Sequence, residues 1–106
     1  MVFPTTIALM NDFLERKITE KELFDLTPLG VNFDAIYLCS ALVLEEYRNK
    51  GIAKKLTLEA IERIRKDYPI KFLFVWAFTK EGGTLSSKIA SEVNLPLKNY
   101  GKFGDV

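Results

Sequence analysis

The chain has 106 residues, 48% of them hydrophobic and 27% charged, and its 15 basic and 14 acidic side chains leave a formal net charge of +1. This composition is typical of a packed globular protein, and the length predicts a single domain that spans residues 1–106. The near balance of charge excludes a general electrostatic attraction to nucleic acid or to an anionic membrane surface. We therefore expect any anion site to be local.

Histidine is absent, and Cys39 is the only cysteine. An internal disulfide, a thiolate zinc site and nucleophilic pairs that depend on histidine are therefore excluded, and we expect no metal. Cys39 lies in an apolar run, where we expect a small buried side chain rather than a reactive one. The N-terminal sequence lacks the features of a secretory signal, and no apolar run is long enough to span a membrane, so we predict a cytoplasmic protein.

Helical patterns dominate the residues before position 35. The first helix is predicted to follow a cap at Thr5 or Thr6, and the second begins at Thr19, which forms a Thr-x-x-Glu capping box with Glu22. Pro28 and Gly30 are expected to end the second helix. The apolar face of the first helix consists of Ile7, Leu9, Met10, Phe13 and Leu14.

The rest of the chain predicts an α/β fold. Two nearly continuous apolar runs, at 35–44 and 70–78, are typical of strands that are covered on both faces, and the segment 50–67 between them has helical periodicity. Such a βαβ unit predicts two parallel neighbouring strands. We expect residues 79–83 to form a loop and Thr84 to cap a last helix at 84–93, which ends near Asn94.

The segment between the first apolar strand and the helix has the features of a phosphate site. The first N–H groups of a helix lack intrahelical partners, and a phosphate can accept their hydrogen bonds. Gly51 permits close approach of the backbone, Ala53 keeps the first turn uncrowded, and Arg48 and Lys50 add positive charge. The plain alternative is an ordinary strand-to-helix turn with a solvated cationic rim.

The longer run Leu42–Leu56, LVLEEYRNKGIAKKL, resembles motif A of the GNAT superfamily of N-acetyltransferases. The positions that match this motif are Val43, Glu46, Tyr47, Arg48, Lys50, Gly51, Ile52 and Leu56, with Ala53 as a common variant of the last glycine. The resemblance implies a GNAT-like mixed sheet that binds acetyl-CoA or another acyl-CoA. It implies that the pantetheine arm lies along Ala41, Leu42 and Val43. It also implies that the pyrophosphate is held by Arg48, Asn49, Lys50, Gly51, Ile52, Ala53 and Lys54.

The resemblance further implies transfer of an acetyl group to a primary amine by direct attack, without a covalent intermediate. No catalytic residue is assigned. Asp34, Glu45 and Glu46 are candidate bases, although a solvated residue at the end of a strand is the favoured interpretation of each one alone. Ala90 falls where many family members have the tyrosine that protonates the leaving thiolate. The residues that could lie near that position are Ser86, Ser87 and Tyr100.

Two alternatives to an acetyltransferase remain open. About thirty residues precede the first apolar strand, fewer than in a typical member of the family, and together with Ala90 this favours a non-catalytic module that senses CoA or binds a protein partner. A βαβ module for another phosphate ligand is the second alternative. Trp76 and Phe78 are expected in the core, at the border of any acyl pocket. We also expect a homodimer, since a short apolar sheet needs its edges covered.

Overall fold

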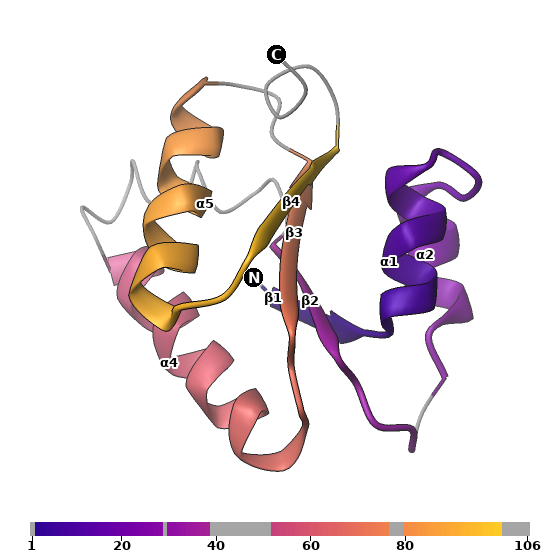
Figure 1. The fold of residues 1–106 in the computed structure, drawn as a ribbon, viewed down its shortest axis with the longest axis horizontal. Coiled ribbons are helices and arrows are strands. Elements are labelled where there is room, and N and C mark those ends of the chain that lie inside the picture. Colours follow the sequence, from indigo (N-terminus) through magenta and orange to yellow (C-terminus); the bar gives the residue numbers. More distant parts are fainter. Residues whose placement is uncertain (1, 29, 39–51, 77–79, 101–106) are drawn as a thin grey trace.

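The computed structural model describes residues 2–28, 30–38, 52–76 and 80–100. Within these ranges the chain forms an α/β fold with four strands and four helices around one mixed sheet (Figure 1). The strands are β1 (Val2–Thr5), β2 (Ala35–Leu38), β3 (Phe72–Trp76) and β4 (Leu97–Tyr100). The helices are α1 (Ile7–Leu14), α2 (Glu20–Leu26), α4 (Ile52–Asp67) and α5 (Lys80–Val93).

The sheet has the order β1-β2-β3-β4, so each strand lies beside its neighbour in sequence. β1 runs antiparallel to β2, with Thr5 opposite Ala35. β2 and β3 are parallel, as are β3 and β4. Because parallel neighbours need a crossover, α4 connects β2 to β3 and α5 connects β3 to β4. The described residues thus confirm the predicted βαβ unit.

The helices form two layers, with α4 and α5 on one face of the sheet and α1 and α2 on the other (Figure 1). The side chains of β2 alternate between two cores, as the pleat of a strand requires. Ile36 and Leu38 pack in the core beneath α4 and α5, whereas Ala35 and Tyr37 pack in the core beneath α1 and α2. All four are fully buried, which confirms that this strand is covered on both faces.

Local capping explains where the two N-terminal helices begin. The Thr6 hydroxyl accepts a hydrogen bond from the Leu9 backbone N–H at 3.2 Å, so Thr6 rather than Thr5 is the cap of α1. Thr19 and Glu22 form the predicted capping box, with reciprocal hydrogen bonds of 3.1 and 3.0 Å. The two caps satisfy N–H groups that the helices themselves leave without partners.

Aromatic side chains join α1 and α2 to the sheet. The ring of Phe13 lies 5.3 Å from that of Tyr37, 5.9 Å from that of Phe74 and 6.2 Å from that of Trp76. The Tyr37 hydroxyl donates a hydrogen bond of 2.6 Å to the Glu20 carboxylate at the start of α2. Trp76 is therefore a partly buried member of this core, as expected, whereas Phe78 lies outside the described residues.

The structure corrects one predicted element, α5, and adds two strands that were not predicted. α5 begins at Lys80, so the segment 80–83 is helical rather than a loop, and Thr84 lies inside the helix instead of capping it. β1 and β4 were not predicted, and the N-terminal part is therefore not wholly helical. Both strands are only four residues long and lie at the edges of the sheet, where pairing with β2 and β3 holds them.

Candidate functional site

The predicted phosphate segment connects the carboxyl end of β2 to the start of α4. The structure places Ile52 and Ala53 as the first two residues of α4, and Lys54 follows them in the first turn. The other residues predicted to contact CoA lie outside the described residues, namely Ala41, Leu42, Val43, Arg48, Asn49, Lys50 and Gly51. Cys39, Glu45 and Glu46 lie outside them too.

The first turn of α4 carries positive charge and no acidic side chain. The N-terminal end of a helix has a partial positive charge, which acidic residues usually compensate and which Lys54 and Lys55 increase. In contrast, Arg65 and Lys66 in the last turn of α4 complement the dipole. An anion at the start of α4 would meet N–H groups without intrahelical partners and two nearby ammonium groups.

The ammonium group of Lys54 is held by α5. Lys54 Nζ lies 2.9 Å from Glu92 Oε2, and the two side chains are 28% and 50% exposed. Figure 1 shows that the C-terminal part of α5 lies beside the first half of α4, which brings these residues of different helices together. Glu92 therefore compensates part of the charge that Lys54 would offer to an anion.

The two central parallel strands are paired as far as their described carboxyl ends. Ala35 lies opposite Phe72, and the register continues to Leu38 opposite Val75. In open α/β sheets, ligands bind outside the carboxyl ends of parallel strands. The residues predicted to line the pantetheine arm follow Leu38 by three to five positions in the sequence and lie outside the described residues.

Asp34, one of the candidate bases, has a structural role. Its Oδ1 accepts a hydrogen bond of 2.6 Å from the backbone N–H of Ile7, the first residue of α1. Its backbone N–H bonds to Thr5, and its backbone oxygen accepts from Lys71. Asp34 precedes β2 and thus lies at the amino edge of the parallel strands, away from the predicted phosphate segment.

The residues considered for protonating a thiolate lie on or beside α5. Ala90 and Ser86 are 5% and 2% exposed, so both belong to the buried face of the helix. Ser87 is exposed on the other side of α5, and Tyr100 ends β4. Ser86 is thus shielded from solvent in this arrangement.

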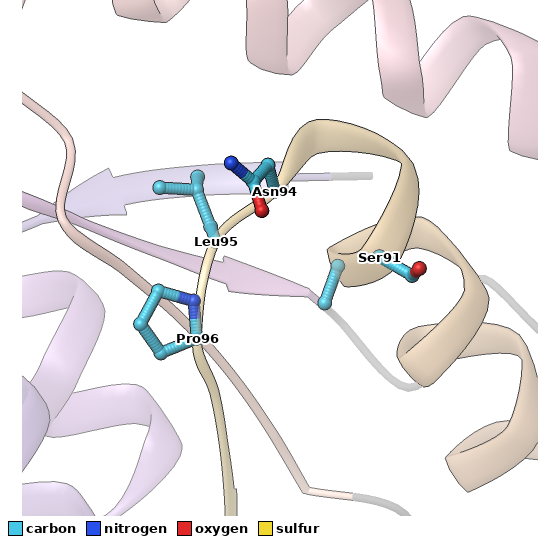
Figure 2. A pocket seen from close by; sticks show the side chains of 5 residues that line it. Ser91, Asn94, Leu95 and Pro96 are labelled. Carbon is cyan, nitrogen blue, oxygen red and sulfur yellow. The ribbon is translucent and has the colours of Figure 1, made fainter.

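A pocket of about 450 Å³, largely open to solvent, lies at the turn from α5 to β4 (Figure 2). Asn94 ends the helix there with a φ of 57°, a left-handed conformation that asparagine adopts more readily than most residues. None of the described residues that line it has an ionisable side chain. The lining residues are Ala90, Ser91, Asn94, Leu95 and Pro96.

Two residues near the candidate site were not predicted from sequence. Glu92 is one of several acidic residues on exposed helix faces, and nothing in its local pattern distinguishes it as the partner of Lys54. Asn99 lies in β4, a strand that was itself missed, and its side-chain oxygen is buried without a hydrogen bond. Both depend on contacts between elements that are far apart in the sequence.

Among the described residues, no group of three or more histidine, cysteine or acidic side chains is arranged to hold a metal ion. The helices in this part of the chain are too short or too polar to cross a bilayer. Comparisons with protein-family models, curated proteins and solved structures found no match to the chain.

Proposed function

We propose that this protein is a GNAT-like α/β domain that binds acetyl-CoA or another acyl-CoA through Arg48–Lys54 and transfers the acetyl group to a primary amine. The observation that carries the proposal is the extended match of Leu42–Leu56 to motif A. The start of α4 directly after Gly51 supports it, as do the parallel pairing of β2 with β3 and a first helical turn without acidic residues.

The proposed chemistry needs positioning more than reactive side chains. The amine nitrogen attacks the thioester carbonyl carbon, the C–S bond breaks, CoA leaves as a thiolate, and the attacking nitrogen loses its proton. A backbone N–H near Val43 would stabilise the negative charge that develops on the carbonyl oxygen. No covalent enzyme intermediate is required, which suits a sequence without histidine.

The first experiment is a calorimetric titration of the protein with acetyl-CoA, with ATP as the control ligand. Selective, saturable binding of acetyl-CoA is expected. Equal affinity for ATP would instead favour a general phosphate-binding module, and no binding by well-folded protein would contradict the proposal.

The variant Arg48→Glu tests whether the segment Arg48–Lys54 binds acetyl-CoA. It is expected to abolish binding of acetyl-CoA because a carboxylate replaces the cation beside the phosphates. Arg63→Glu is the matched control, since Arg63 is an exposed residue of α4 that lies three turns beyond the start of the helix. Circular dichroism of both variants must match that of the wild type, and retained binding by folded Arg48→Glu would contradict the assignment.

The alternative function is a non-catalytic CoA-binding module. It is favoured by Ala90, which takes the place of the family's tyrosine and is only 5% exposed. Loss of one general acid does not by itself prevent turnover, because such catalysis contributes only about 10²- to 10⁴-fold. An acetylation assay with a library of amines separates the two functions: binding without transfer to any amine would support the non-catalytic module.

A further inference from the structure

Helix α4 turns one face to the core and the opposite face to solvent. Ile61 is fully buried, and Leu58 and Ile64 pack against the same core. Seven residues share the opposite face at helical spacing, and six of them are exposed while Ala60 is half-buried. We call them the outer stripe of α4: Lys55, Leu56, Glu59, Ala60, Arg63, Lys66 and Asp67.

The outer stripe contains an apolar side chain that is largely in water. Leu56 is 58% exposed, and it shares this property with only Leu26 among the large apolar residues that the structure describes. A single apolar side chain on a surface is ordinary. What Leu56 can do therefore depends on the residues around it.

The charged residues of the outer stripe form no ion pair within the part of the chain that the structure describes. Glu59 is spaced to pair with Lys55 or Arg63 along the helix, and neither pair forms. The ion pairs of α4 are made instead by Lys54 and Arg65, which also contact α5. The charges of the outer stripe thus stay available to another molecule.

The order of these charges is complementary to itself. A twofold axis near the middle of the helix can place a second α4 antiparallel to the first, so that each half of the stripe meets the other half. Glu59 then lies opposite Arg63 of the second copy, and Lys55 lies opposite Asp67 of the second copy. The symmetry makes each attraction twice. A parallel pair in register would place each charge opposite an identical one.

The same arrangement covers the exposed leucine. Leu56 lies opposite the aliphatic stem of Lys66 of the second copy, which removes apolar surface from water. Ala60 lies near the axis, where a small side chain lets two helices approach closely. An apolar contact and four charge pairs are thus satisfied together.

The edges of the sheet are less suited to hold a second copy. Within the described residues β1 and β4 are the edge strands. Pro4 in β1 has no backbone N–H to donate, and β4 carries the exposed charge of Lys98. Both features oppose pairing with another strand.

We propose that the outer stripe of α4 is the interface of a homodimer in which two α4 helices pack antiparallel about a twofold axis. The inference is independent of the proposed function. A single pair of helices buries less surface than the roughly 1,200–2,000 Å² of stable interfaces, so the dissociation constant is expected to be on the order of 10–100 µM.

Sedimentation velocity at protein concentrations on both sides of this value measures the dimer. Arg63→Glu and Glu59→Arg each turn two attractions into two repulsions, and each should weaken the dimer by roughly tenfold or more. The swap variant, which combines Glu59→Arg with Arg63→Glu, restores both attractions with the charges exchanged. It should recover most of the lost affinity.

The control for net charge combines Glu59→Arg with Lys88→Glu, because Lys88 is an exposed residue of α5. This control has the net charge of the swap variant without its charge pairs, and it should remain as weak as Glu59→Arg alone. Circular dichroism of all variants should match that of the wild type, since the buried face of α4 is unchanged.

A wild type that is monomeric at every concentration would overturn the inference, and the outer stripe would then be a solvated face or a contact for a different protein. A swap variant that fails to recover would overturn the antiparallel arrangement. Equal recovery in the control would also overturn it, because net charge rather than the pairing of Glu59 with Arg63 would then explain the result.

Discussion

Lys54 and Glu92 form an ion pair of 2.9 Å that joins the first turn of α4 to the last turn of α5. Each charge lies at the end of its own helix where the dipole disfavours it, since the N-terminal end is positive and the C-terminal end is negative. The pair therefore relieves two unfavourable placements at once. A phosphate ligand at the start of α4 would compete with Glu92 for the same ammonium group.

Glu92→Gln is expected to tighten the binding of acetyl-CoA by roughly two- to fivefold, the range that corresponds to the free energy of one partly exposed ion pair. The substitution keeps the shape of the side chain and removes the carboxylate charge that lies 2.9 Å from Lys54 Nζ. Calorimetric titration at low ionic strength measures the effect, which should decline as salt is added.

The control for this substitution is Glu62→Gln, which removes the same charge from a residue 3.5 Å from Arg65, near the other end of α4. It should leave the affinity unchanged. A similar gain in both variants would mean that net charge, rather than release of Lys54, explains the result. Weaker binding by Glu92→Gln would contradict the prediction directly.

Asp34→Ala is expected to destabilise the fold by about 1 kcal/mol, because the backbone N–H of Ile7 loses the carboxylate that accepts its hydrogen bond at 2.6 Å. Asp34→Asn retains an acceptor and should lose less. Urea unfolding measures both changes. The affinity for acetyl-CoA should stay the same in both variants, and a selective loss of binding in the stable Asn variant would instead connect Asp34 to the ligand site.

Arg65→Met should destabilise the protein by about 1 kcal/mol. The substitution removes the charged donor that Arg65 of α4 supplies to the C-terminal end of α5, and it keeps the aliphatic part of the side chain. Arg65 Nη1 donates a hydrogen bond of 2.7 Å to the backbone oxygen of Val93, the last residue of α5. Arg63→Met is the control, since Arg63 is exposed on the same helix. Equal stability of the two variants in urea would show that the Val93 contact contributes nothing measurable.

Gly30→Ala is expected to cost about 1 kcal/mol of stability, since Gly30 has a φ of 78° and an L side chain is strained in that region. A Cβ there would meet no atom within 4 Å, so the cost arises from the backbone rather than from a clash. Gly30→Asn should cost less because asparagine tolerates left-handed conformations. Thermal unfolding of the two variants checks this order, and the reverse order would contradict the backbone explanation.

Local signals predicted several elements well. The capping box at Thr19 and Glu22 lies within four residues, and both of its hydrogen bonds are present. The predicted start of α5 is wrong because Gly82 and Gly83 indicate a loop, whereas both lie in the helix. The apolar stripe that includes Leu85 and Ile89 packs this helix against the sheet. Packing outweighed the low helix propensity of the glycines.

The edge strands and the contacts of the site depend on distant residues. β1 contains Pro4 and β4 contains Lys98, so neither has the pattern of a typical strand, and each is held by pairing with a central strand. The pairing of Lys54 with Glu92 likewise arises only once α4 and α5 pack together. The resemblance of Leu42–Leu56 to motif A predicts where an anion would bind, whereas contacts such as that of Lys54 with Glu92 follow from tertiary structure.

The complete burial of β2 has a consequence for its alignment within the sheet. A slip of one residue exchanges the two faces of a strand, and in β2 it would still place apolar side chains in both layers. The hydroxyl of Tyr37 makes the two alignments unequal, because only the native one presents it to Glu20 at 2.6 Å. Helix α2 therefore helps to fix the alignment of β2 within the sheet.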